Sequence, residues 1–148
     1  MIKELNHNDP AVAQLIVGLQ KRSYQLEADI LGVTSLPPFD EGEVEVQSSE
    51  ENFIGYVSEE KVYGFASYEK LFEGYLITRL GVDPDHLRKG IGTSMLNYFE
   101  ERAMYPLEIM TGKDNIPAVR LYEKHGFEAV AYAETEEGIW LVKLRKEK

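Results

Sequence analysis

A proline and two closely spaced glycines interrupt the middle of the chain, and they restrict its fold more than any other feature. The apolar stretch Tyr75 to Val82 is followed by Pro84 and then by the turn Gly90-Ile91-Gly92. Beyond the turn, apolar residues recur with the spacing of one helix face, at Ile91, Met95, Leu96, Phe99 and Ala103. The pattern predicts a strand, a tight turn and an amphipathic helix from about Gly92 to Arg102.

The start of this predicted helix is suited to binding a phosphate group. The first-turn N–H groups of a helix have no acceptor inside the helix, and the helix dipole adds partial positive charge there. Gly90 and Gly92 have no Cβ, so a diphosphate can approach the main chain, and Arg88 and Lys89 add positive charge. Such a turn can equally serve only to begin a helix. It is not a P-loop, which needs Gly-Lys-Ser/Thr, and it lacks the third glycine of a dinucleotide-binding fold.

Short strands and helices are predicted on both sides of this segment. On the N-terminal side we expect a strand at Met1 to Leu5, a helix opening near Pro10, a second helix at Ser23 to Leu31, and a mobile loop over Thr34 to Glu51. An antiparallel meander should follow, with strands at Phe53 to Val57, Val62 to Tyr68 and Tyr75 to Val82. On the C-terminal side we expect a strand at Leu107 to Thr111, a helix at Asn115 to His125, and strands at Phe127 to Ala133 and Ile139 to Leu144. Helices between strands of one sheet predict a mixed α/β architecture, in a single domain over residues 1–148.

The composition excludes several classes of site and partner. The chain has no cysteine, so a disulfide framework, a zinc–thiolate site and a thiol nucleophile are excluded. The formal charge of −10, from 26 acidic and 16 basic residues, opposes binding to nucleic acid, which depends on phosphate neutralisation by basic side chains. The longest apolar stretch, Ala11 to Leu19, is too short to span a bilayer. We therefore expect a cytoplasmic protein with neither nucleic acid nor a membrane as a partner.

A second motif, Asn115-Ile-Pro-Ala-Val-Arg-Leu-Tyr-Glu-Lys-His-Gly-Phe127, follows the predicted strand at Leu107 to Thr111. Asn115 can cap a helix, Pro117 suits its first turn, and Gly126 suits a left-handed cap at its end. An asparagine cap before a buried leucine and tyrosine is also common in helices that carry no function.

Together, and in this order, the two segments resemble the signatures of the GNAT superfamily of acyl-CoA N-acyltransferases. The first is similar to that family's Gln/Arg-x-x-Gly-x-Gly/Ala motif, and the second to its Asn-x-x-Ala-x-x-Leu-Tyr-Glu-Lys-x-Gly-Phe helix. The resemblance implies the GNAT fold, a mixed central sheet of about six to seven strands that is flanked by about four helices and splayed at the fourth and fifth strands. One position departs from the motif, since Leu87 stands where the family has Gln or Arg.

The resemblance also implies acetyl-CoA as a cosubstrate, without a metal. It assigns the diphosphate chiefly to main-chain N–H groups at the helix start, and the pantetheine arm to the main chain of Leu80 and Val82. The full set of expected cofactor-binding residues is Leu80, Gly81, Val82, Arg88, Lys89, Gly90, Ile91, Gly92, Thr93, Asn115, Ala118 and Tyr122. The histidines lack metal-ligand spacing and receive no catalytic role: His7, His86 and His125.

Tyr122 is similar to the family's general acid. A phenol, with a pKa of about 10, is a weaker acid than a thiol at about 8.5, so Tyr122 must donate its proton in concert with thiolate departure or act through a hydrogen bond. The general base is less well defined: Glu73, Glu27 and Asp29 are candidates, although each can equally be a solvated surface charge. Candidate walls of the acceptor pocket, which can equally be core residues, are Tyr24, Phe39 and Tyr75.

The implied activity is transfer of an acetyl group to a primary amine of a small molecule or a protein, by direct attack and without a covalent acyl-enzyme. An acidic loop, Asp40 to Glu51, favours a cationic acceptor. The alternatives are a noncatalytic acyl-CoA-binding regulatory module and a purely structural interaction domain. The strand Ile139 to Leu144 is expected at a sheet edge, where it can pair with a second copy in a homodimer.

Overall fold

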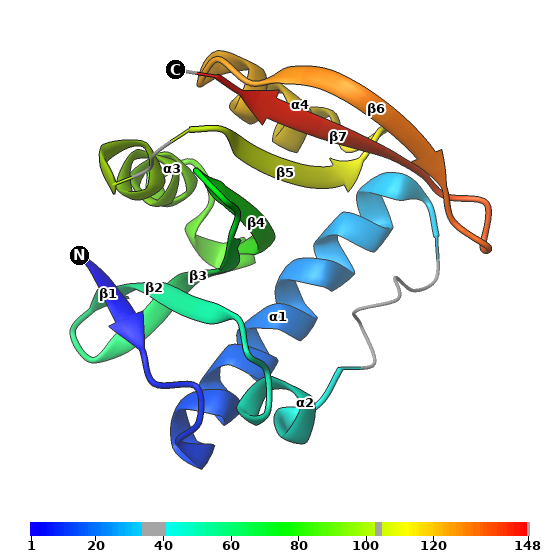
Figure 1. Cartoon of the computed structure of the whole chain (residues 1–148). Coiled ribbons are helices and arrows are strands. Elements are labelled where there is room, and N and C mark those ends of the chain that lie inside the picture. Colours follow the sequence, from blue (N-terminus) through cyan, green and yellow to red (C-terminus); the bar gives the residue numbers. More distant parts are fainter. Residues whose placement is uncertain (34–40, 103–104, 148) are drawn as a thin grey trace.

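The chain folds around a seven-stranded mixed sheet (Figure 1). The computed structural model describes residues 1–33, 41–102 and 105–147. In these residues the strands are β1 (Ile2–Leu5), β2 (Asn52–Ser58), β3 (Lys61–Lys70), β4 (Tyr75–Val82), β5 (Leu107–Gly112), β6 (Glu128–Glu134) and β7 (Trp140–Lys146). The helices are α1 (Pro10–Leu31), α2 (Glu43–Gln47), α3 (Ile91–Arg102) and α4 (Ile116–Lys124), with a short 3-10 turn at Pro84–His86.

The sheet has two antiparallel parts joined by one parallel pair of strands. Strands β2 to β4 form the predicted antiparallel meander, and β1 pairs antiparallel with β2 at its edge. Strand β4 runs parallel to β5, and β7 is antiparallel to both β5 and β6. The resulting order is β1-β2-β3-β4-β5-β7-β6, which confirms the mixed α/β class. The expectation of an edge strand at Ile139 to Leu144 is wrong, because β7 lies between β5 and β6. It buries Val142 and Leu144, whereas every residue of the edge strand β6 is exposed.

The two helices predicted before Gly32 are one continuous helix, α1. Asp9 caps its start, where the carboxylate accepts a hydrogen bond from the Ala11 N–H at 2.9 Å, and Gly32 ends it with a φ of 71°. The residues that join the two predicted helices, Gln20 to Arg22, are good helix formers and contain no breaker. The predicted interruption before Ser23 is therefore wrong.

The predicted loop Thr34 to Glu51 contains the short helix α2 in its described part. The Gly42 N–H donates a hydrogen bond to the Glu45 carboxylate at 3.0 Å, and Val46 is fully buried in the cluster formed with α1. A helix this short has no periodicity that a sequence pattern can reveal, and it forms because of this packing. Residues 34–40, with Phe39 and Asp40, lie outside the described part of the chain, as does Ala103.

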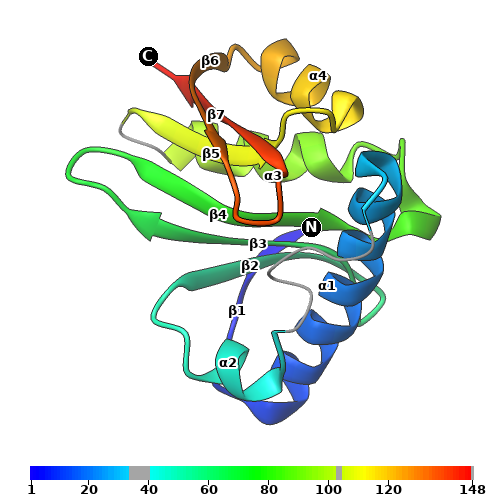
Figure 2. The same cartoon turned by 90° about the vertical axis from the view of Figure 1, so that its right-hand side faces the viewer.

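The helices cover both faces of the sheet (Figure 2). Helices α1 and α2 pack on one face, and α3 and α4 pack on the other. Successive strand residues serve opposite faces, so Phe53 and Phe65 contact the α1 layer while Ile54 and Ala66 contact the α3 layer. Within the described ranges, no helix combines the length and the apolar character needed to cross a membrane.

Two strand glycines let the helices lie directly on the sheet. A Cβ at Gly81 of β4 would lie 2.4 Å from Phe65 Cε1 and 2.7 Å from Ser23 Oγ, so α1 approaches the strand too closely for any side chain there. On the other face, a Cβ at Gly64 would lie 2.6 Å from Ile91 Cγ2, at the start of α3. These contacts set the positions of α1 and of the α3 N-terminus relative to β4.

The close approach at Gly81 predicts a large effect for a single added methyl group. Gly81→Ala should lower the free energy of unfolding by about 1–3 kcal/mol, because the core must shift to admit the Cβ. The matched control is Gly18→Ala, at an exposed position of α1 where a Cβ would meet nothing within 4 Å. That change should raise the free energy by about 0.5–1 kcal/mol. Urea unfolding measures both, and equal stability of Gly81→Ala and the wild type would contradict the packing described here.

Candidate active site

The parallel pair of strands separates partway along its length. Pairing of β4 with β5 covers Tyr75–Ile77 against Leu107–Ile109 and stops there. The register between β3 and β4 shifts at the same level, where Thr78 is an extra residue in β4. A bulge of this kind bends its strand and interrupts the ladder, which turns β4 away from β5. The expected splay at the fourth and fifth strands is therefore confirmed.

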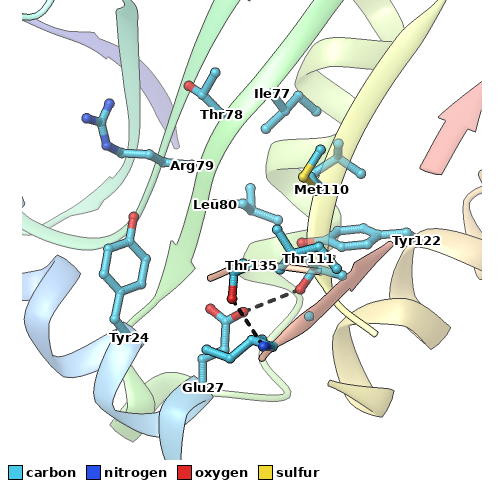
Figure 3. Close-up of a pocket in the computed structure, with 14 residues that line it drawn as sticks. Tyr24, Glu27, Ile77, Thr78, Arg79, Leu80, Met110, Thr111, Tyr122 and Thr135 are labelled. Atoms are coloured by element: carbon cyan, nitrogen blue, oxygen red, sulfur yellow. Dashed lines mark hydrogen bonds between the residues drawn. The ribbon is translucent and has the colours of Figure 1, made fainter. Parts of the chain in front are cut away.

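A pocket of about 310 Å³ opens where the two strands diverge (Figure 3). Its lining residues come from α1, β4, β5, α4 and the β6–β7 hairpin: Tyr24, Glu27, Ile77, Thr78, Arg79, Leu80, Ile109, Met110, Thr111, Gly112, Tyr122, Thr135, Ile139 and Leu141. Aliphatic side chains from the strands form much of the wall. Seven of the fourteen residues carry a polar side-chain group, and among these the Glu27 carboxylate and the Tyr122 phenol can take part in proton transfer.

The segment between β4 and α3 forms a cradle of exposed main chain. Arg88 and Gly90 have left-handed conformations, with φ values of 64° and 78°, and a Cβ at Gly90 would meet nothing within 4 Å. Helix α3 begins at Ile91, so its first N–H groups point toward this open side. Arg88 and Lys89 are exposed beside it. The main chain here is accessible to an anion, as the glycine turn predicts.

The two glycines of the turn have different surroundings. A Cβ at Gly92 would lie 3.1 Å from Leu121 Cδ2, so this residue permits close packing of α3 against α4. Gly90 instead faces open space. Leu87, where the family motif has Gln or Arg, has an exposed side chain.

The segment before the cradle is held by an ion pair with α1. Both Asp83 carboxylate oxygens accept hydrogen bonds from Arg22, at 2.6 and 3.0 Å, and one of them also accepts the Asp85 N–H. These donors lower the pKa of Asp83 against the opposing effect of burial. The same helix thus supports the cradle and carries Glu27.

Tyr122 lies on α4 with its side chain 5% exposed, and it lines the pocket. Asn115 caps this helix, since its side-chain oxygen accepts the Ala118 N–H at 3.4 Å. Burial and the nearby charge of Glu27 raise the pKa of Tyr122 well above that of a free phenol. The phenol therefore remains protonated over the range in which proteins are stable.

Glu27 projects into the same pocket from α1 and lies opposite β5 (Figure 3). Burial raises the pKa of its carboxyl, although hydrogen bonds from Asn115, the Gly112 N–H and Thr111 act in the other direction. The Thr111 hydroxyl lies 3.5 Å from the carboxylate. Two of the residues singled out in the sequence for acid–base roles, Tyr122 and Glu27, thus line one cavity.

The other candidates from the sequence lie elsewhere. Glu73 is exposed in the turn between β3 and β4, beside the end of β4 that is paired with β5, and it does not line the pocket. Asp29 is exposed on α1 and accepts a hydrogen bond from Gln25 at 2.9 Å. Tyr24 lines the pocket, whereas Tyr75 packs against Tyr68 and Phe99 in the core. Each histidine has a separate neighbour: His7 contacts Ser49, His86 packs against Tyr63 with the rings tilted, and His125 contacts Glu100.

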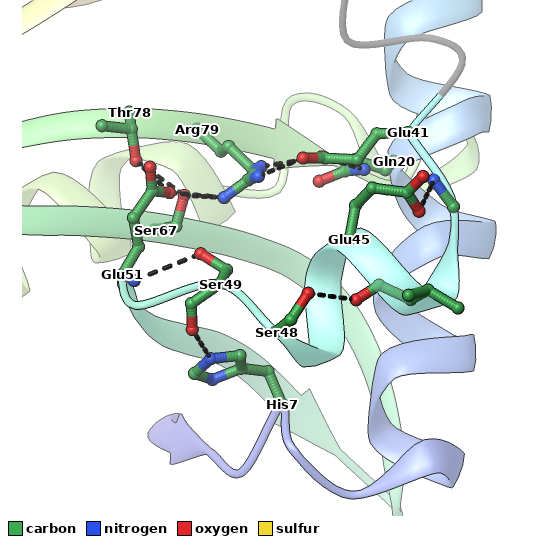
Figure 4. A network of polar contacts seen from close by, with 12 residues as sticks. His7, Gln20, Glu41, Glu45, Ser48, Ser49, Glu51, Ser67, Thr78 and Arg79 are labelled. Carbon is green, nitrogen blue, oxygen red and sulfur yellow. Dashed lines mark hydrogen bonds and ion pairs between the residues drawn. The ribbon is translucent and has the colours of Figure 1, made fainter.

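Arg79 is a pocket residue that the sequence patterns did not single out. It forms two hydrogen bonds with Glu41, at 2.6 and 3.2 Å, and another with Glu51 (Figure 4). Its guanidinium also lies over the Phe53 ring, 5.0 Å from the ring centre. The pKa of Arg79 is raised by these carboxylates despite burial. The sequence signal that could have identified Arg79 is its position as a charged residue within the otherwise uncharged strand β4. Two carboxylates of the acidic loop are therefore already paired.

Comparison with known proteins identifies similar chains. The model described as "Acetyltransferase (GNAT) family" matches residues 19–127. The UPF0157 protein YqkA of Bacillus subtilis (strain 168) is 34% identical over 143 residues, which is 95% of this chain and 42% of that protein. Peptidyl-lysine N-acetyltransferase YiaC of Escherichia coli (strain K12) is 31% identical over 85 residues, 55% of this chain and 56% of that protein. The chain thus spans about half the length of these curated relatives.

The fold is also similar to that of solved structures. The crystal structure of the PaiA N-acetyltransferase from Thermoplasma acidophilum in complex with coenzyme A has a TM-score of 0.72 and 15% sequence identity. The match covers 100% of this chain and 98% of that chain. At this identity the likeness concerns the arrangement of strands and helices.

The Arg79 cluster predicts a strong dependence of stability on one guanidinium. Arg79→Met should lower the free energy of unfolding by about 3–5 kcal/mol, because it leaves the half-buried Glu41 and Glu51 without their cation. Arg102→Met is the matched control, since Arg102 and its partner Glu101 are both exposed, and it should cost less than about 1 kcal/mol. Chemical denaturation measures both variants. Losses of equal size would show that the Arg79 pairs contribute no more than surface ion pairs.

Burial of Glu27 predicts that this residue lowers stability at neutral pH. Because burial raises its pKa, the ionised carboxyl is disfavoured in the folded state, so Glu27→Gln should raise Tm by about 2–5 °C near pH 7.5. The difference should shrink as the pH falls through the folded-state pKa, since wild-type Glu27 then becomes neutral. Calorimetry at several pH values tests this, with the exposed Glu73→Gln as control. A lower Tm for Glu27→Gln at neutral pH would refute it.

Proposed function

Because the chain belongs to the GNAT acetyltransferase family, we propose that it transfers the acetyl group of acetyl-CoA to a primary amine. The observation that carries the proposal is the pocket between the splayed strands, which Tyr122 and Glu27 line from different helices. The coenzyme A complex of similar fold supports the choice of cosubstrate. The relative named as a peptidyl-lysine N-acetyltransferase supports an amine acceptor.

The cradle is proposed to hold the diphosphate of the cosubstrate. The main chain from Arg88 to Thr93 supplies N–H donors, the open space at Gly90 admits the anion, and Arg88 and Lys89 add positive charge. Beyond Ile77, the edge of β4 that faces β5 is released from pairing. Its main-chain groups at Leu80 and Val82 are therefore available to the amides of the pantetheine arm.

Bound acetyl-CoA supplies an acetyl group activated as a thioester. An alkyl amine with a pKa of about 10.4 is almost entirely protonated at neutral pH, so a base must remove a proton before it can attack. Glu27 is proposed as this base. Because burial raises its pKa, its carboxylate holds a proton more strongly than that of an exposed glutamate.

Tyr122 is proposed to donate a hydrogen bond to the departing sulfur. Its raised pKa makes full proton transfer to a thiolate less favourable than for a free phenol. Of the two roles that the sequence left open, the hydrogen bond is therefore the better supported. Since the chain has no cysteine, we propose direct attack by the amine and no acyl-enzyme.

The charge distribution around the pocket bears on the acceptor. Arg79 pairs with Glu41 and Glu51, and among the described residues that line the pocket Glu27 is the carboxylate that can attract an ammonium group. Much of the surrounding surface is apolar, with aliphatic side chains from β4, β5 and the β6–β7 hairpin. We propose that the acceptor presents a single amine on an apolar chain, as a lysine side chain does, on either a small molecule or a protein.

Thiol release from acetyl-CoA, measured with a panel of alkyl monoamines, lysine derivatives and polyamines, tests the activity. With the best amine, kcat/KM should rise with pH through the pKa of Glu27, because the base must be ionised. Glu27→Gln should remove this dependence and lower kcat by about 100-fold or more, and Tyr122→Phe should lower it by about tenfold to 100-fold. If no amine releases thiol although coenzyme A raises Tm, the chain is a binding module and the proposal fails.

A further inference from the structure

We propose that the turn between β5 and α4, through Thr111, Gly112 and Asn115, is the device that positions Glu27 for proton transfer. The inference rests on the role of Glu27 in the proposed function. It reassigns Asn115, which the family resemblance places among the cofactor contacts, to a positioning role.

Three donors from five consecutive residues meet the Glu27 carboxylate. The Thr111 hydroxyl lies 3.5 Å from Oε1, and the Gly112 N–H and the Asn115 side chain are near enough to lower the pKa of this carboxyl against the effect of burial. Figure 3 shows the Thr111 contact across the pocket from α1. An ionised carboxylate only accepts hydrogen bonds, so three donors match this form of Glu27.

Asn115 is oriented from both ends of its amide. Its oxygen accepts the Ala118 N–H at 3.4 Å and so caps α4, which leaves the NH₂ group as the part of the amide that can donate toward Glu27. The amide thus connects the first turn of the helix that carries Tyr122 to the carboxylate on α1. One side chain therefore sets the base relative to the helix of the proposed acid.

The turn approaches α1 closely because Gly112 lacks a side chain. A Cβ at Gly112 would lie 2.8 Å from Leu31 Cδ1, in the last turn of α1. Leu31 lies four residues after Glu27, so both lie on one side of the helix. The absence of a side chain at Gly112 thus allows the main chain of the turn to lie directly against the part of α1 that carries Glu27.

The other ionisable groups around Glu27 do not stabilise its ionised form, so this stabilisation must come from the donors of the turn. Tyr122 on α4 and Tyr24 on α1 are neutral phenols with pKa values raised by burial. Arg79 on β4 is held by Glu41 and Glu51. No cation in the described part of the chain is within ion-pairing distance of Glu27, so hydrogen bonds must stabilise its ionised form.

Titration of ¹³C-glutamate-labelled protein by NMR tests the proposal without an acceptor substrate. The Glu27 carboxyl resonance is identified by its absence in Glu27→Gln. Thr111→Val removes one donor, and Asn115→Ser removes another but keeps a helix cap. Both should move the Glu27 titration midpoint to higher pH and lower the ionised fraction below the midpoint roughly threefold to tenfold. Thr135→Val is the control, since its hydroxyl bonds to the Ile139 N–H, and the midpoint should not move.

Unchanged midpoints in folded Thr111→Val and Asn115→Ser would overturn the inference. If Asn115→Ser fails to fold, Asn115→Asp also keeps the cap, and it must raise the midpoint further by adding a negative charge. Calorimetry with coenzyme A gives a second readout. Weaker binding to Asn115→Ser with an unmoved midpoint would assign Asn115 to the cofactor instead. If Glu27→Gln keeps full turnover, the proposed base is wrong, and the NMR titration still decides whether the turn positions this carboxylate.

Discussion

The end of backbone pairing between β4 and β5 is the constraint from which the rest of the site follows. After Ile77 and Ile109 the strands separate, and the sheet gives up hydrogen bonds that a continuous parallel ladder would make. The gap admits side chains from α1 on one face and α4 on the other, so Glu27 and Tyr122 reach one pocket. It also leaves a strand edge inside the molecule, where an extended ligand with amide groups can complete the interrupted ladder.

The separation of the strands leaves two charged groups, Arg79 and Glu27, in poorly solvated positions, and each is stabilised in a different way. Arg79 is paired with two carboxylates from the segment that carries α2, so its charge serves to anchor that segment. Glu27 receives only neutral donors from the turn after β5. Neutral donors favour the ionised carboxylate less strongly than a guanidinium would, and they leave the group able to take up a proton. The contrast distinguishes the carboxylates that pair with Arg79 from Glu27, the carboxylate proposed as the base.

Features encoded locally were predictable, and features that depend on distant contacts were not. The glycine turn before α3, the asparagine cap of α4 and the meander each follow from residues close together in the chain. The last two strands exchange their expected order because β7 buries its own Val142 and Leu144 between β5 and β6. No local sequence pattern specifies this placement. Likewise, Tyr122 was identified through its motif, whereas Arg79 gains its partners from residues 28 and 38 positions away. Glu27 could be named as a candidate base from the sequence, but only the structure shows that Glu27 lines the pocket and Glu73 does not.

The exposed edge strand β6 has one further consequence, for self-association. Its sequence, Glu-Ala-Val-Ala-Tyr-Ala-Glu, places a glutamate at each end of a strand that is otherwise uncharged. In an antiparallel pairing of two copies centred on Ala131, Glu128 of each would lie directly opposite Glu134 of the other. Like charges that face one another across strands repel, and charged ends are a common protection of edges against uncontrolled annealing. The strand thus carries its own barrier to aggregation along the most accessible border of the sheet.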